Sequence, residues 1–481
     1  MHLLNIGQWH RRINSALAFA GCLAFTGCAM LRHTAPSQQQ DVDWWPQWDR
    51  LFQQIDHPLL RKLALYELPW HTHLTIGVEP TSNRLPTGPV MDLPPGSHRQ
   101  ETYTAADRPY GLFTLATAAA GTYVPRGLLR TYALPDTSTH RPVIEYRCFL
   151  YAQATAVVAA IAHQHIGLAE RWLGALIDTQ VDQGPNRGAF PAFVSAVTGQ
   201  TEQLYLRTGT DAWCLYALAF YLQQAPEGKL TGPAQQSLAL GLEYLRRHRF
   251  KKVRPGYRAF LGGVGLWKDD YKIFEDDHQV TWAATEHQID MYFTLRLAVE
   301  VLADSPYARQ LEHYHWMRTH VHRTLLDVLW IEDQGRLAQG VRPAHIDPRD
   351  ALDLHSWGAL FLRAAGEEEK ARQTLADIEA FRVVDRGVEG MTPYLAERGY
   401  QHATGGVWSE GTLGAALAFK AMGAGQAASH LYDQNMRLLG PQGLPYLTRP
   451  NAEYEMQDWP DVASLSWALI YQQPNGFWEV D

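Results

Sequence analysis

Apolar residues recur at helical spacing through most of the chain. They fall three and four positions apart in eleven segments, and this period predicts α-helices. The segments span residues 148–162, 168–181, 211–224, 234–247, 286–302, 307–330, 350–365, 368–380, 409–422, 426–439 and 461–471. Short β-like pieces, GAFPAFVS (188–195) and GVGLWK (263–268), lie between them and are expected to form hairpins or ordered loops. The pattern therefore predicts an all-α protein with a few short hairpins.

The predicted helices alternate in character. One set is apolar on every side, as in GTLGAALAFKAMG (411–423), and the intervening set carries charges along one face, as in YARQLEHYHWMRTHVHRTL (307–325). A helix that is apolar all round must be surrounded by protein, and an amphipathic helix can cover it from the solvent side. We therefore expect two concentric layers closed into an (α/α)6 toroid, six helical hairpins with long loops at one end. Residues 44–66 or the extreme C-terminus would supply the twelfth helix.

The first 28 residues have a different pattern. Arg11 and Arg12 precede the short apolar run ALAFAGCLAFTG, which ends on small residues at Cys28. These are features of a secretory signal, and the run is too short to span a membrane. LAFTGC is similar to a bacterial lipobox, in which the cysteine is freed by cleavage and lipidated, although Phe25 stands where leucine is usual. Cys22 is the weaker candidate for lipidation, and a soluble secreted protein remains the alternative.

This resemblance implies a lipoprotein of the cell envelope, sorted to the outer membrane and facing the periplasm because Ala29 rather than aspartate follows the cysteine. Residues 1–27 would be the signal peptide and 28–42 a polar tether. No Gly/Ser linker divides the rest, so residues 43–481 are expected to form one domain.

Composition limits the classes of molecule that the protein is expected to bind. With 46% hydrophobic residues, 19% charged residues and a formal charge of −8, the chain can bury a large core and has no basic character suited to nucleic acid. Only Cys148 and Cys214 remain after the signal, and they can either pair or fill the core as buried thiols. Histidines are abundant at 21, but none sits in an HExxH motif, so neither a metal nor another cofactor is expected.

Acidic residues mark the starts of several apolar helices. In TEHQ (285–288), Thr285 can cap the helix and Gln288 can reach back, which puts Glu286 in the first turn where backbone N–H groups are unpaired. Asp290 lies one turn deeper on the same face. Two acids stacked at the mouth of a barrel can hold different pKa values, which acid–base catalysis requires. The alternative is that Glu286 only improves the cap and Asp290 takes a buried hydrogen bond.

Three further acids begin helices beside aromatic or imidazole groups. Glu410 follows Trp408 in the glycine-rich GGVWSEGTLG (405–414), where a flat ring can stack a sugar beside an acid. The other two are Asp211, two residues before Trp213, and Asp353, two residues before His355. Each of these aspartates is a candidate base or, alternatively, a partner of the helix dipole.

The segment before Glu286, residues 254–284, is rich in aromatic side chains among glycines and charges: Tyr257, Phe260, Trp267, Tyr271, Phe274 and Trp282. Flat apolar faces suit the C–H surfaces of a pyranose, although aromatic residues more often belong to the core. We expect two of the six, with Trp267 and Trp282 as the named candidates, to face the substrate.

Four motifs together, YLRTGTDAWCLYALAFYLQ (205–223), GGVGLW with TEHQIDMYFTLRLA (262–298), LDLHSWGALFL (352–362) and GVWSEGTLGAALAF (406–419), resemble bacterial proteins of the six-hairpin glycosidase superfamily. The resemblance covers residues 140–475 and implies an exported (α/α)6 enzyme that cuts or remodels polysaccharides. It also implies chemistry at the inner-helix N-termini and on the loops beside them.

Three functions follow as hypotheses. The first is a glycoside hydrolase acting on an exported or cell-surface polysaccharide, with Glu286 as acid and Asp211, Asp353 or Glu410 as base or nucleophile. The second is a polysaccharide lyase, which would use Tyr292 or His287 as the base and Arg207 to neutralise a uronate. The third is a lipoprotein that binds glycan or a secretion partner without catalysis.

Overall fold

A computed structural model gives the structure of the protein for residues 51–67, 127–135, 144–201, 204–268, 273–451, 456–473 and 478. The predicted signal peptide, Cys28 and the tether lie outside these ranges, so those predictions stay predictions. Within them, no helix is both long enough and apolar enough to cross a membrane.

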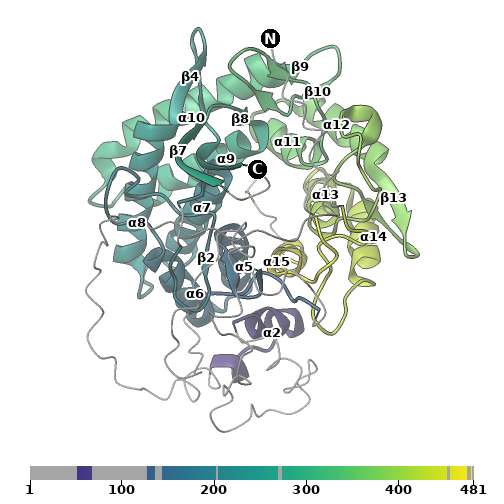
Figure 1. The fold of residues 1–481 in the computed structure, drawn as a ribbon, viewed down its shortest axis with the longest axis horizontal. Coiled ribbons are helices and arrows are strands. Elements are labelled where there is room, and N and C mark those ends of the chain that lie inside the picture. The colour runs from purple at the N-terminus through teal and green to yellow at the C-terminus, as the bar shows by residue number, and fades with distance from the viewer. Residues whose placement is uncertain are drawn as a thin grey trace, which may run out of the picture.

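Helices form two concentric layers around a common axis (Figure 1). The inner layer consists of α5 (Leu150–Ala162), α7 (Thr208–Gln224), α9 (Thr285–Val301), α11 (Asp353–Ala364), α13 (Ser409–Ala421) and α15 (Val462–Tyr471). The outer layer consists of α6 (Ile166–Asp178), α8 (Thr231–Tyr244), α10 (Leu311–Thr324), α12 (Glu368–Ala376), α14 (Gly425–Met436) and α2 (Pro58–Leu65). Of the two sources expected for the twelfth helix, the N-terminal segment supplies it.

The inner layer closes on itself. Each inner helix packs on the next one along the chain, and the last, α15, packs on the first, α5. Each also packs on its own outer helix, and α2 covers α15 although the two are far apart in sequence. This arrangement confirms the predicted toroid of six helical hairpins.

Small residues let the inner helices and their aromatic side chains approach closely. A Cβ atom at Gly411 would lie 2.1 Å from the Trp408 ring, and one at Gly414 would lie 2.8 Å from the ring of Trp357. Both positions therefore need glycine for packing. Cys148 and Cys214 are both buried free thiols among these helices.

Short antiparallel strands hold the loops near the inner-helix N-termini. The pairs are β1 (Arg147–Phe149) with β2 (Phe193–Ser195), β4 (Phe250–Arg254) with β5 (Tyr257–Phe260), β9 (Trp330–Ile331) with β10 (Arg336–Leu337), and β13 (Arg382–Asp385) with β14 (Val388–Met391). Two sheets have three strands: β3 (Leu206–Arg207), β6 (Gly263–Lys268) and β7 (Ile273–Val280), and β12 (Ile346–Asp347), β11 (Gly340–Val341) and β8 (Ala283–Ala284). Strand β8 leads directly into α9, so the second sheet fixes where α9 begins.

Trp478 lies in the interior of the ring of helices. Its side chain is buried and stacks on Phe293 of α9, with ring centroids 4.2 Å apart and an angle of 10° between the rings. It also contacts Trp213 of α7 at 6.0 Å and Trp357 of α11 at 5.4 Å. An aromatic side chain from beyond α15 thus fills space between three inner helices.

We predict that Leu63→Ala, in the helix that covers α15, lowers the free energy of unfolding by about 2–5 kcal/mol, because Leu63 is fully buried and its truncation leaves a cavity. Denaturant unfolding followed by circular dichroism measures it. Glu369→Ala, at an exposed position of α12, is the control and should change that free energy by less than about 0.5 kcal/mol. Equal stability of the two variants would show that α2 is not an integral part of the ring.

Candidate functional site

Acidic side chains from three inner helices lie close enough to influence one another, at the end of the ring where the inner helices begin. The pKa of Asp353, on α11, is raised well above its ordinary value by removal from bulk water and by the charges of Glu286, Glu410 and Asp290. Glu286 and Asp353 are partly exposed to solvent, whereas Glu410 and Asp290 are buried. We call these four side chains the acidic cluster.

The position of each acid follows from how its helix begins. Glu286, Asp353 and Glu410 lie in the first turns of α9, α11 and α13, where unpaired backbone N–H groups favour negative charge. The predicted capping box at α9 is wrong, because Thr285 donates its hydroxyl to the Ala338 carbonyl and no side chain caps the helix. Gln288 does reach back, but it donates to the carbonyls of Ala284 and Phe260 and so ties α9 to β5.

Glu410 is held by aromatic donors. Its carboxylate accepts a short hydrogen bond from the Tyr151 hydroxyl, which in turn accepts one from the Trp467 indole at 3.0 Å. Burial, together with the negative charges of Asp461 and Glu286, raises the pKa of Glu410 to about 8, although the hydrogen bonds from Tyr151 and Trp467 oppose the shift. At neutral pH this carboxyl group is therefore mostly protonated.

Asp290 lies one turn below Glu286 and is 6% exposed. Burial and the charges of Glu286 and Glu410 raise its pKa well above the ordinary value, and a hydrogen bond from Trp213 only partly offsets this. One of its oxygens, Oδ1, has no hydrogen-bond partner. Asp290 thus lies on the same face of α9 as Glu286, buried and with a raised pKa.

Glu286 has a different environment from Glu410. It accepts a hydrogen bond of 3.2 Å from the Gln339 amide, whose oxygen accepts one of 2.8 Å from the Tyr400 hydroxyl. Burial raises the pKa of Glu286, and the bond from Gln339 acts in the opposite direction. Because Glu286 is also in contact with solvent, it is the better candidate of the two glutamates for the ionised form.

Within the described part of the chain, no cation pairs with any acid of the cluster, and each lies near other acids.

A second acidic group shows the opposite arrangement. Asp350, His355 and Asp377 bring ligand atoms within 4.8 Å of one another, a geometry that could hold a metal ion. However, Arg398 bonds both aspartates, each at 2.5 Å, and Arg336 lies 3.5 Å from Asp350. Guanidinium groups already supply the positive charge, so these residues do not fit a metal site.

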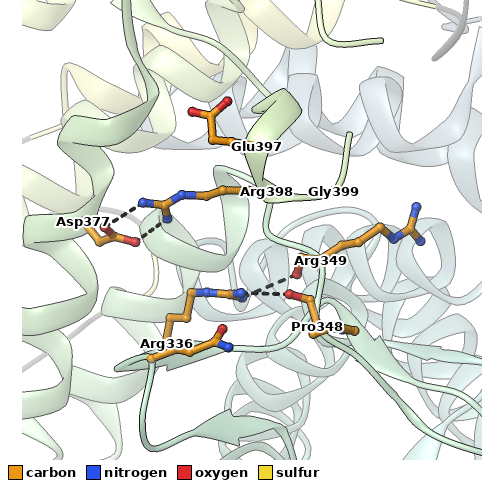
Figure 2. A pocket seen from close by; sticks show the side chains of 8 residues that line it. Arg336, Pro348, Arg349, Asp377, Glu397, Arg398 and Gly399 are labelled. Carbon is orange, nitrogen blue, oxygen red and sulfur yellow. Dashed lines mark hydrogen bonds and ion pairs between the residues drawn. The ribbon is translucent and has the colours of Figure 1, made fainter. Parts of the chain in front are cut away.

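A surface pocket of about 560 Å³ adjoins this charged network (Figure 2). In Figure 2, Arg398 bonds Asp377 while Arg336 donates to the backbone carbonyls of Pro348 and Arg349. Arg349 makes two hydrogen bonds to Asp347, at 3.0 and 2.8 Å. Since every arginine in the pocket is engaged by acceptors of the chain, the pocket offers no unpaired guanidinium to an anionic ligand. The residues that line it are Gln334, Arg336, Pro348, Arg349, Asp377, Glu397, Arg398 and Gly399.

Two of the predicted site residues lie elsewhere. Asp211 is buried and accepts a hydrogen bond of 2.7 Å from the Phe190 amide, and the charge that influences its pKa is that of Arg249 rather than of the acidic cluster. His355 is fully buried and bonds Asp350 at 2.7 Å, in the charged network described above. Both lie near helix starts as expected, but Asp211 bonds the loop before β2, and His355 bonds Asp350 and the Thr374 carbonyl of α12. Asp461, which also stands at the start of an inner helix, caps α15 by accepting from the amides of Ala463 and Ser464.

The predicted lyase residues are largely engaged in structure. Tyr292 is buried and packs edge-on against Phe361 at 5.0 Å, with His322 of the outer helix α10 also beside it. Arg207 donates to the carbonyls of Leu206, Val264 and Gly265 and lies over the Tyr205 ring. Neither residue is therefore poised for a substrate.

His287, the residue directly after Glu286, has a ring nitrogen that is available for chemistry. It is partly exposed, its Nδ1 has no partner, and its ring lies 5.8 Å from that of Trp282. Burial, and to a lesser extent the charge of Arg207, lower the pKa of His287 to about 4, so the imidazole is neutral at neutral pH.

Two of the predicted aromatic candidates lie near the acidic cluster. The Trp282 ring lies beside His287, the residue after Glu286, and Trp213 donates a hydrogen bond to Asp290. Trp408 is 7% exposed, precedes α13 directly and leaves its indole N–H without a partner. Phe260 belongs to the core, and Tyr257 lies beneath the guanidinium of Arg323. The side chains of Trp267 and Tyr271 are outside the described residues.

Four groups that contact the acids directly or through one intervening side chain were not predicted: Tyr151, Trp467, Gln339 and Tyr400. Tyr151 had a detectable signal, since it is a polar ring in the first turn of an otherwise apolar inner helix. Trp467 lies in the predicted apolar helix 461–471, where a tryptophan gives no sign that it serves a polar contact. Gln339 and Tyr400 come from loops without periodicity, and only the folded chain shows that Gln339 bonds Glu286 and that Tyr400 bonds Gln339.

Comparison with known proteins bears on the fold. No protein-family model and no curated protein matches the chain. Among solved structures, a wild-type glycosidase is 14% identical, with a TM-score of 0.52, covering 73% of this chain and 91% of that one. A cellobiose 2-epimerase from Bacillus thermoamylovorans is 9% identical, with a TM-score of 0.52 over 72% and 92% of the two chains. A D-mannose isomerase is 12% identical, with a TM-score of 0.50 over 77% and 94%.

At these identities the likeness concerns the fold alone. The chain has the (α/α)6 fold of the six-hairpin glycosidase-like proteins, as its motifs led us to expect.

We predict that Glu410→Gln increases the free energy of unfolding at pH 7 by about 1–3 kcal/mol. The unfolded chain ionises this group near its ordinary value of 4.5, whereas the folded chain keeps the proton up to about pH 8. The wild type therefore loses stability relative to the variant as pH rises from 4.5 to 8. Thermal unfolding at a series of pH values should show equal stability below about pH 4. A variant that is less stable at pH 7 than at pH 4, relative to wild type, would contradict the raised pKa.

Proposed function

We propose that the protein is a glycoside hydrolase that cleaves an O-glycosidic bond by carboxylate acid–base catalysis. The observation that carries this proposal is the meeting of Glu286, Asp353 and Glu410 at the starts of three inner helices without a neutralising cation among the described residues. Hydrolysis of a glycoside needs one carboxyl group that donates a proton and one carboxylate that activates water or attacks the sugar. The likeness of the fold to a glycosidase supports the same reaction class.

The two glutamates are suited to different roles. Glu410 is buried and protonated at neutral pH, so it is the better proton donor to the leaving oxygen. Glu286 contacts solvent and accepts a hydrogen bond from Gln339, so it is the better base or nucleophile. This assignment exchanges the roles expected from the sequence, where Glu286 was the acid. The charges of Glu286, Glu410 and Asp290 raise the pKa of Asp353, because like charges at short range disfavour a further ionisation.

Aromatic rings beside the acids suit a sugar. Trp282 lies next to His287 at the entrance of α9, and Trp408 directly precedes Glu410. Rings in such positions can stack on the C–H face of a pyranose while the indole N–H of Trp408 donates to a hydroxyl group. The substrate class is therefore an oligosaccharide or polysaccharide.

We predict that Glu410→Gln and Glu286→Gln each lower kcat/KM by about 10²–10⁴-fold, because each removes one partner of the acid–base pair. The measurement is release of reducing ends from a panel of bacterial exopolysaccharides, with absorbance of unsaturated products recorded in parallel.

Glu300→Gln is the matched control, since Glu300 is an exposed residue near the other end of the same helix as Glu286. Its kcat/KM should equal that of the wild type. Full activity of Glu286→Gln would refute the catalytic role, and it would favour a protein that binds glycan without cleaving it.

Proton abstraction from a sugar is the second candidate. A neutral His287 with an unpartnered Nδ1 beside Glu286 could take a proton next to a carbonyl or carboxylate group, as a lyase or an epimerase requires. The engagement of Tyr292 and Arg207 in packing and backbone hydrogen bonds weighs against the lyase. Unsaturated products, or a converted sugar without new reducing ends, would favour this candidate over hydrolysis.

The location of the protein is a further part of the proposal. The apolar run before Cys28 and the resemblance of LAFTGC to a lipobox support export and attachment to the membrane through a lipidated cysteine. The enzyme would then act on glycan in the periplasm, next to the outer membrane.

We predict that Cys28→Ala abolishes incorporation of a fatty-acid label and releases the protein from the membrane fraction, because the lipid-bearing thiol is lost. Labelling with an alkyne fatty acid and cell fractionation measure both effects. Cys22→Ala is the control and should retain the label. Persistence of label in Cys28→Ala and its loss in Cys22→Ala would move the lipidation site to Cys22.

A further inference from the structure

Glu286 is connected to the loop that carries Tyr400 by two hydrogen bonds. The Gln339 amide donates to Glu286 at 3.2 Å, and the Tyr400 hydroxyl donates to the Gln339 oxygen at 2.8 Å. We propose that Gln339 and Tyr400 are positioning residues for the reaction: Tyr400 sets the orientation of the Gln339 amide, and the amide sets the orientation and charge of Glu286. This inference rests on the proposed role of Glu286 and extends it to residues that do not touch the substrate.

The main chain of Gln339 is fixed relative to Glu286. Its carbonyl accepts a hydrogen bond of 3.0 Å from the amide of Thr285, the residue directly before Glu286. Its own N–H donates to the Asp347 carbonyl at 3.0 Å, and the Thr285 hydroxyl donates to the adjacent Ala338 carbonyl. The start of α9 and the segment that carries Gln339 therefore move as one unit, so that the remaining freedom is that of the Gln339 side chain.

Tyr400 is held rigidly as well. It is 6% exposed, and its ring stacks on that of Tyr394 with centroids 4.2 Å apart and 20° between the planes. The guanidinium of Arg349 lies 5.2 Å from the centroid of the Tyr400 ring. A buried phenol in a fixed ring position presents its hydroxyl at a fixed point, which is what a positioning residue requires.

The direction of the two hydrogen bonds gives the chain its chemical effect. A primary amide has one accepting oxygen and one donating nitrogen, and a carboxylate can only accept. When the Tyr400 hydroxyl donates to the Gln339 oxygen, the amide nitrogen must face Glu286, and that N–H stabilises the ionised carboxylate. Without the hydroxyl, the amide can rotate and present its oxygen, which favours protonated Glu286 instead.

Three other acids lie near Glu286 on the surrounding elements: Asp290 of α9, Asp353 of α11 and Glu410 of α13. The charge of Glu286 raises the pKa of each of them, and His287 beside it is neutral at neutral pH. The Gln339 amide is the one group that lowers the pKa of Glu286 among the described residues. Loss of its orientation should therefore be visible in the titration of Glu286.

The test is a titration of Glu286 by NMR in protein labelled with carboxyl-¹³C glutamate, with the resonance assigned by its absence in Glu286→Gln. Tyr400→Phe removes only the hydroxyl and keeps the stacked ring, and it should raise the pKa of Glu286 by about one unit. Tyr432→Phe, which removes a half-buried hydroxyl on the outer helix α14, is the control and should leave the pKa unchanged. An unchanged pKa in folded Tyr400→Phe would overturn the proposal.

Gln339→Met provides a second variant in case Tyr400→Phe disturbs the fold. It keeps the length of the side chain without the amide, and it should raise the pKa of Glu286 in the same direction. Where a substrate is hydrolysed, the acidic limb of the kcat/KM profile should move upward by the same amount in both variants. If no substrate is cleaved but the NMR shift occurs, the proposed function fails and the positioning role stands.

Discussion

The acidic cluster is a group of carboxyl groups that the rest of the fold has to hold close together and away from bulk water. Four carboxyl groups lie near one another, with Asp290 and Glu410 buried, and the described residues supply no cation to neutralise them. Removal from water and mutual repulsion both disfavour ionisation, so burial there costs stability. The packed ring of helices offsets this cost, since each inner helix is buried along most of its length against two neighbours and an outer helix. Such opposition between local cost and global packing is common at functional sites.

The same chain contains an acidic group of a different kind, and the contrast is informative. Asp350 and Asp377 are bridged by Arg398, and their pKa values are lowered rather than raised. Hydrogen bonds from arginine make that network a structural unit that joins the loop before α11 to the end of α12 and to the turn that carries Arg398. Acids that a fold uses for support are thus paired, whereas those of the acidic cluster are left free to exchange protons.

Sequence periodicity accounted for the architecture because the inner and outer helices have different burial. The inner set is apolar all round since it is enclosed, and the outer set is amphipathic since one face meets water. Periodicity also placed Glu286, Asp353 and Glu410 in first turns, where the structure has them. It could not decide the direction of each side chain. Asp211 lies near a helix start as well, yet it turns toward Phe190, because a shift of one or two residues around a helix changes the face by 100° or more.

Closure of the ring has a consequence for how the chain reaches its folded state. Helix α2 ends at Leu65 and packs on α15, which begins at Val462, so the contact that completes the outer layer joins segments about 400 positions apart. Local hairpins such as α5 with α6 can form early, but the last pairing must wait for nearly the whole sequence and bears the largest loss of chain entropy. Partly assembled rings would meanwhile expose the apolar sides of inner helices, which makes such intermediates prone to aggregate.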